Sequence, residues 1–95
     1  MDAFTAAQIP DGKHHGFYLR YKDEPSFFLK RGMRTLEKRL GEHEAKVVQP
    51  DKYIPEFSTL AEHQQASLIA NWLDEIANFR EQISSLQGIL ERRTT

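Results

Sequence analysis

Residues 69 to 90, IANWLDEIANFREQISSLQGIL, carry the most regular hydrophobic pattern in the chain. Apolar residues recur there at alternating steps of three and four: Ile69, Trp72, Ile76, Phe79, Ile83, Leu86 and Leu90. This spacing is typical of one face of an α-helix. Upstream, Thr59 and Glu62 fit a capping box, in which two side chains bind free backbone amides at a helix start. The pattern therefore predicts a helix over residues 60–92, about 50 Å long.

A second helix is predicted over residues 26–46, because Leu29, Met33, Leu36 and Leu40 repeat at steps of four, three and four. Residues 49–57 contain two prolines and predict a non-helical connection between the helices. We therefore expect a mainly α fold, built as an antiparallel helical hairpin of residues 26–46 and 60–92.

The segment before this hairpin has a different period. In residues 15–22, HGFYLRYK, the side chains of Phe17, Leu19 and Tyr21 alternate with Tyr18, Arg20 and Lys22, and a period of two is typical of a β-strand. A lone strand needs a partner for its backbone hydrogen bonds, and the sequence leaves that partner open. We expect a single domain with a flexible arm (1–12), an extended, strand-like segment (13–24) and the hairpin (25–95).

The helix predicted over residues 60–92 carries two apolar rows. Beside the first row runs a second one of mostly small residues: Ala66, Ala70, Leu73, Ala77 and Ser84. Together the rows span an arc of about 160°, whereas one packing face usually needs about 100°. Either the N-terminal segment covers the second row, or the row is an interface with a second copy or with a target protein. The candidate interface residues are Ile69, Ala70, Trp72, Leu73, Ile76, Ala77, Phe79, Ile83, Leu86 and Leu90.

Charge is distributed unevenly along the chain. Residues 13–46 contain nine Lys or Arg and five Asp or Glu, whereas residues 51–90 contain two and six. Either the two halves neutralise each other in the fold, or the basic half faces a polyanion or an acidic partner. Cysteine is absent, which fits a reducing compartment, and we expect a cytoplasmic protein. No apolar run is long enough to span a membrane, so we expect no membrane partner.

The sequence offers little catalytic chemistry. It contains no Gly-rich phosphate loop, no HExxH motif and no nucleophile elbow, so we expect a protein that is not an enzyme. His14 and His15 are adjacent and follow Asp11 closely, but no third His or Cys has the spacing of a metal ligand. We therefore expect neither a metal site nor a cofactor.

Basic and aromatic residues alternate between residues 17 and 39. Interleaved cations and rings suit phosphate contacts and base stacking, although an exposed helix face is often charged merely for solubility. The candidate ligand-binding or phosphate-binding residues are Tyr18, Arg20, Tyr21, Lys22, Lys30, Arg31, Arg34 and Lys38, with Arg39 alongside them.

These observations favour a small protein-interaction module, oligomeric or bound to a protein target, that acts by binding or occluding a macromolecule as an accessory regulator or inhibitor. In general style it resembles the small accessory proteins that phages make against host machinery, but no motif points to one family. The alternative is binding of nucleic acid or a phosphorylated nucleotide through the basic-aromatic surface of residues 17–39.

Overall fold

The computed structural model describes residues 1–94, and this part of the chain is mainly helical, as predicted. It contains five α-helices and one short 3₁₀ helix: α1 (Ala3–Ala7), α2 (His15–Tyr21), α3 (Ser26–Val48), α4 (Pro50–Tyr53), η1 (Phe57–Thr59) and α5 (Glu62–Thr94). No β-strand occurs among the described residues. The fold is therefore all α in residues 1–94.

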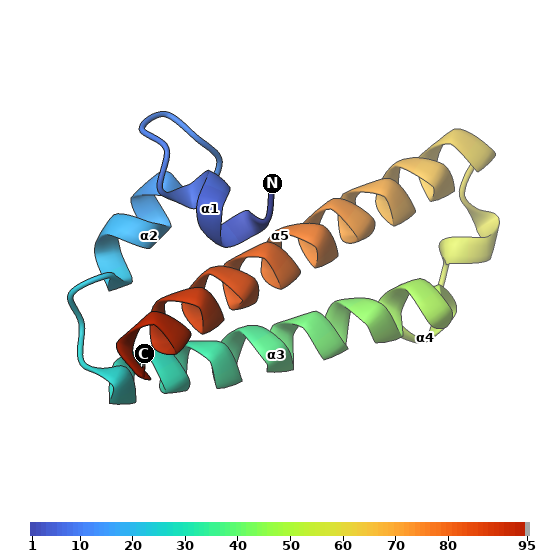
Figure 1. Cartoon of the computed structure of the whole chain (residues 1–95). Helices are drawn as coiled ribbons and strands as arrows, with labels where there is room; N and C mark the ends of the chain where they lie inside the picture. Colours follow the sequence, from blue (N-terminus) through green and yellow to red (C-terminus); the bar gives the residue numbers. More distant parts are fainter. Residues whose placement is uncertain (95) are drawn as a thin grey trace.

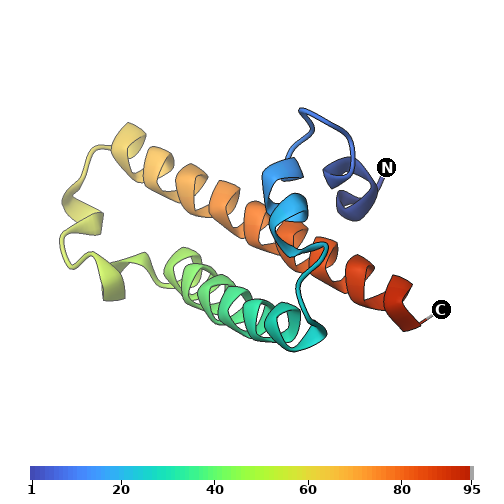
Figure 2. The ribbon, with the colours of Figure 1, turned by 90° about the vertical axis from the view of Figure 1, so that its left-hand side faces the viewer.

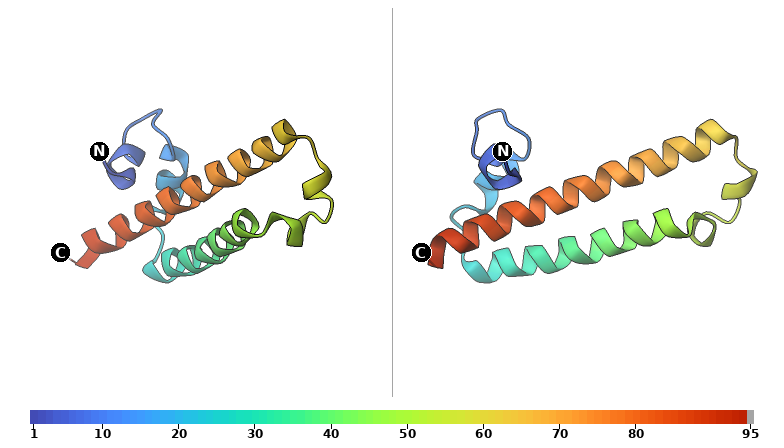
Figure 3. Two further views of the ribbon diagram at one scale, coloured as in Figure 1. Left: turned by 90° about the vertical axis from the view of Figure 1, so that its right-hand side faces the viewer. Right: turned by 45° about the vertical axis from the view of Figure 1, so that its right-hand side comes forward.

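The two long helices, α3 and α5, lie side by side and run in opposite directions (Figure 1). They diverge toward α4, as the right-hand view of Figure 3 shows. The molecule is elongated, with principal extents of 52 × 26 × 18 Å. Most residues of both helices are consequently exposed or only partly buried.

The hydrophobic core lies in the half of the helix pair that contains the C-terminal half of α5. Its buried members are Leu29 and Leu36 from α3, and Ile83, Leu86 and Ile89 from α5. Leu29 and Leu86 are fully buried. The N-terminal helices add partly buried side chains to this cluster: Phe4, Phe17, Tyr18 and Tyr21.

The other end of the helix pair is closed by a smaller apolar contact. The ring of Phe57 in η1 stacks on Trp72 in α5, with a centroid distance of 6.3 Å, and both side chains are buried. The predicted capping box is wrong, because Thr59 belongs to η1 and its hydroxyl donates to the Glu56 carbonyl at 2.6 Å. The start of α5 is capped slightly later, where the Ala61 amide donates to Gln64 Oε1 at 3.1 Å.

The predicted strand-like segment is helical instead. Residues 15–21 form α2, in which Phe17 and Tyr21 are one turn apart with ring centroids at 4.8 Å, and both rings pack against the core. Leu19, the middle residue of the apparent alternation, is 49% exposed. A helix satisfies its own backbone hydrogen bonds, whereas a strand here would have no partner strand. The apolar contacts of this segment therefore follow a helical spacing of four residues, from Phe17 to Tyr21, and not the spacing of two that is typical of a strand.

The predicted flexible arm contains a packed helix. Asp2 caps α1 by accepting a hydrogen bond from the Thr5 amide at 2.7 Å, and Ala7 is fully buried. Figure 2 shows α1 and α2 together beside the C-terminal half of α5. The turn after α1 allows this return, with positive φ angles of 66° at both Asp11 and His14.

Candidate functional site

The first apolar row of α5 holds the fold together. Trp72, Ile76, Ile83 and Leu86 are buried, and the other three members of the row, Ile69, Phe79 and Leu90, are partly buried. Seven of the candidate interface residues therefore face the interior of the chain. Ile69 also lines an open groove at the surface, and the other six are not available as a free interface in this structure.

The second apolar row remains open over most of its length. Its exposed members are Ala66, Ala70, Leu73 and Ala77. Leu73, the largest of them, is 49% exposed. Beside this row lies an open groove of about 540 Å³, lined by Phe57, Glu62, Gln65, Ala66, Ile69, Ala70 and Leu73. Among the predicted interface residues, Ala70 and Leu73 thus lie together at a free surface.

The N-terminal segment does fold onto α5, but closer to the C-terminus than the exposed residues Ala66, Ala70, Leu73 and Ala77. The Ser85 hydroxyl lies 3.5 Å from the Ala3 carbonyl, and Ser85 is fully buried. The ring of Phe4 covers Gly88 one turn further along. Ser85 lies outside both apolar rows of the sequence, so the hydrophobic pattern did not predict that this residue is buried. The sequence feature that could have predicted this contact is the pair of small residues Ser85 and Gly88, which permits a close approach of another helix.

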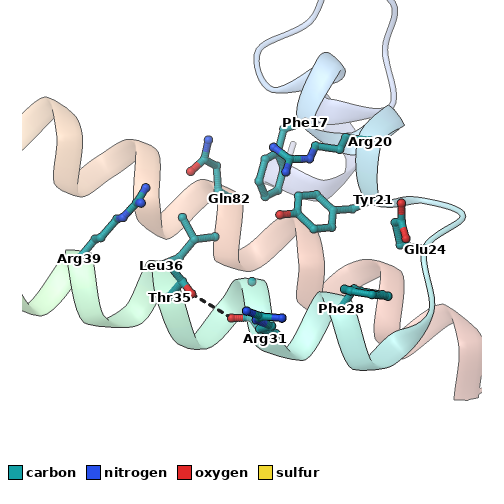
Figure 4. Close-up of a pocket in the computed structure, with 11 residues that line it drawn as sticks. Phe17, Arg20, Tyr21, Glu24, Phe28, Arg31, Thr35, Leu36, Arg39 and Gln82 are labelled. Carbon is teal, nitrogen blue, oxygen red and sulfur yellow. Dashed lines mark hydrogen bonds between the residues drawn. The ribbon is translucent and has the colours of Figure 1, made fainter.

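The basic and aromatic residues meet in a cavity of about 650 Å³ between α2, α3 and α5 (Figure 4). Three arginines line it, namely Arg20, Arg31 and Arg39, and so do three rings, Phe17, Tyr21 and Phe28. Glu24 is the only carboxylate among the described lining residues. We refer to this cavity as the arginine pocket.

Only part of the predicted ligand-binding set contributes to the arginine pocket. Arg20, Tyr21 and Arg31 line it, whereas the other five residues do not: Tyr18, Lys22, Lys30, Arg34 and Lys38. Tyr18 packs edge-on against Phe4, with ring centroids at 6.2 Å. The row of Lys30, Arg34 and Lys38 is exposed elsewhere on α3. Sequence reasoning missed Phe28 as a lining ring and gave Arg39 only a secondary place.

Histidine side chains connect the N-terminal turn to the rest of the chain. His15 Nδ1 donates to the Ala7 carbonyl at 2.8 Å, and His14 Nε2 lies 3.8 Å from Glu81 Oε2. Lys13 Nζ contacts the other oxygen of Glu81 at 2.7 Å. No group of three metal-ligating side chains occurs in residues 1–94. The two adjacent histidines therefore have structural contacts.

Comparison of the chain with protein-family models, with curated proteins and with solved structures finds no match in any of the three. Within the described residues, no helix combines the length and the apolar composition that crossing a membrane requires.

Proposed function

We propose that this protein is a small, non-enzymatic interaction module that binds an amphipathic helix of a target protein in the groove beside Ala66, Ala70 and Leu73. The observation that carries the proposal is that this row stays exposed, because α1 and α2 lie beside the C-terminal half of α5 and α3 packs against its buried row. Small side chains allow another helix to approach closely, and Leu73 supplies an exposed apolar contact.

The dimensions of the groove suit a short helical partner. From Ala66 to Ala77 the exposed row rises about 16 Å, or three helical turns. A partner helix would present anchors at positions i, i+4 and i+7 over that length, as amphipathic helices do in hydrophobic grooves. Phe57 lines one end of the groove, and its ring stacks on the buried Trp72.

The charge around the groove selects the type of partner. Glu62 is the charged residue that lines the groove, and residues 53–79 contain neither Lys nor Arg. Glu75 contacts His43 of α3 and therefore lies away from the groove. A second copy would bring acidic residues of both chains to the same contact, which is unfavourable. We therefore propose a target helix with an apolar stripe flanked by Lys or Arg, and occlusion of that helix as the mode of action.

The proposal is tested with a defined peptide and the full chain. The probe is a synthetic amphipathic helix with Leu at i, i+4 and i+7 and flanking Lys residues, titrated into ¹⁵N-labelled protein. We expect amide shifts confined to residues 57–77. The substitution Ala70→Glu should weaken binding more than tenfold, whereas Gln87→Glu, which adds the same charge to an exposed position of α5 outside the groove, should leave it unchanged.

Three outcomes would contradict this function. An absence of amide shifts at millimolar peptide would show that the groove does not bind a helix. Equal binding of a Glu-flanked peptide would remove the charge argument. Concentration-dependent dimerisation that Ala70→Glu abolishes would show that a second copy of this chain occupies the groove instead.

A further inference from the structure

The arginine pocket lies apart from the groove, between α2 and the N-terminal half of α3 (Figure 4). Its volume of about 650 Å³ is within the range of roughly 300–1,000 Å³ that is usual for small-molecule sites. Three helices contribute its walls, so a ligand there would contact α2, α3 and α5 together. Both arginine side chains and aromatic rings line the pocket.

The three arginines of the pocket have no acidic partner among the described residues. None of the salt bridges in residues 1–94 involves Arg20, Arg31 or Arg39. Elsewhere arginines are engaged: Arg80 pairs with Glu44 at 3.0 Å, and Arg93 donates to the Lys22 carbonyl at 3.0 Å. The cavity thus brings together three guanidinium groups without an acidic partner in a chain whose net charge is −1.

The arrangement of these guanidinium groups favours a shared anion. Arg31 and Arg39 stand two helical turns apart on α3, about 12 Å along its axis, with Thr35 between them. Extended arginine side chains from both ends can reach one anion over Thr35. Arg20 approaches from α2, where its guanidinium carbon lies 5.3 Å from the centre of the Tyr21 ring.

The aromatic lining lies at the end of the pocket opposite Arg39. Figure 4 shows Tyr21 and Phe28 there, together with Glu24. Phe28 is 46% exposed, so part of its ring is accessible to a ligand, although the ring also contacts Phe27 with centroids at 5.5 Å. The Glu24 carboxylate repels an anion at this end and accepts hydrogen bonds from the amino group of a planar ring. An anion therefore fits between Arg31 and Arg39, with the ring of the ligand beside Phe28 and Glu24.

We infer that the arginine pocket binds a phosphomonoester that carries a planar ring, of which a nucleoside monophosphate is the simplest biological example. Three arginines and Glu24 leave a lining charge of +2, which balances the charge of about −1.5 to −2 on a phosphomonoester at pH 7. The planar guanidinium fork matches phosphate oxygens in pairs. A free ligand fits better than a nucleic-acid strand, because the Glu24 carboxylate beside the rings would repel a further phosphate.

The inference is tested by titrating the full chain, labelled with ¹⁵N, with adenosine 5′-monophosphate. We expect amide shifts at residues 17–39 and at Gln82, and none in the groove at residues 62–73. Adenosine, which lacks the phosphate, and inorganic phosphate, which lacks the ring, should each bind at least tenfold more weakly.

Paired variants separate the pocket from general attraction by positive charge. The double substitution Arg31→Gln, Arg39→Gln should weaken binding of the monophosphate at least tenfold. The double substitution Arg34→Gln, Lys38→Gln removes the same charge from exposed positions of α3 outside the pocket and should change binding less than twofold. Circular dichroism of both variants verifies that the helices are retained.

Three results would overturn the inference. No shifts at 5 mM adenosine monophosphate would show that the pocket is not a site for this ligand class. Equal weakening by both double variants would show diffuse electrostatic attraction. Much tighter binding of a fifteen-nucleotide single strand than of the monophosphate would show a nucleic-acid surface. None of these results depends on whether the groove binds a helix.

Discussion

The ring of Phe4 occupies the space where residue 88 would carry a Cβ atom. A Cβ built on Gly88 would lie 2.3 Å from Phe4 Cγ, far inside van der Waals contact. Helix α1 therefore approaches α5 closely only because position 88 is glycine. This one contact couples a residue near the N-terminus to a residue near the C-terminus, and it fixes where the N-terminal segment docks.

The substitution Gly88→Ala should release α1 from α5. The new methyl group and the Phe4 ring cannot share the same space, so α1 must shift although α5 itself gains about 1 kcal/mol of helix propensity. We expect the amides of residues 3–7 to exchange at least tenfold faster with deuterium, while α3 keeps its protection. Hydrogen exchange followed by NMR measures both.

Gly41→Ala is the matched control, because nothing lies within 4 Å of a Cβ at Gly41 in α3. It should stabilise the protein by about 0.5–1 kcal/mol and leave exchange in residues 3–7 unchanged. In a Phe4→Ala background, Gly88→Ala should also become stabilising. If Gly88→Ala left α1 protected with Phe4 present, the Phe4 contact would not determine docking.

The sequence was sufficient to predict the long helices and insufficient for the short ones. The two long helices have strong periods over many turns, and α3 and α5 cover the predicted ranges with ends shifted by about two residues. In α2, Phe17 and Tyr21 fit both a strand period and a helical period. A helix of seven residues is marginal alone, so its packing on the core decides between them.

The candidate site was predicted in part for a similar reason. The row of Ala70 and Leu73 follows from the helical period of α5 alone, but the sequence left open whether the N-terminal segment covers it. The arginine pocket depends on which face of α3 meets α2. The sequence favoured the regular row of Lys30, Arg34 and Lys38, whereas the neighbouring row of Arg31 and Arg39 faces the cavity.

The core and the groove should respond differently to leucine truncation. Leu86→Ala removes a fully buried side chain that packs with Leu29, and it should lower the free energy of unfolding by about 2–5 kcal/mol. Leu73→Ala removes a half-exposed side chain and should cost less than about 1 kcal/mol. Chemical denaturation compares the two variants. An equal decrease in the free energy of unfolding for both variants would mean that Leu73 is covered in solution.

The exposed ion pair between the long helices should contribute little to stability. Arg80 Nη2 lies 3.0 Å from Glu44 Oε2, but the side chains are 61% and 48% exposed. Solvent screens such pairs, so a double-mutant cycle with Arg80→Ala and Glu44→Ala should give a coupling energy below about 1 kcal/mol. The coupling should shrink further in 1 M salt. A coupling energy above 2 kcal/mol would mean that the pair is desolvated.

Asp2 should make the docking of α1 sensitive to acid. The hydrogen bond from the Thr5 backbone amide to the Asp2 carboxylate lowers the pKa of Asp2 below its ordinary value. The charged cap therefore stabilises α1 above the unfolded pKa, and this stabilisation is lost as the pH falls through the lower, folded pKa. Asparagine caps a helix without titrating, so the variant Asp2→Asn should lose this acid-dependent step. Protection factors for residues 3–7, measured for both proteins between pH 5 and pH 2.5, should diverge as the pH falls. Parallel curves would show that the Asp2 carboxylate does not hold α1 in place.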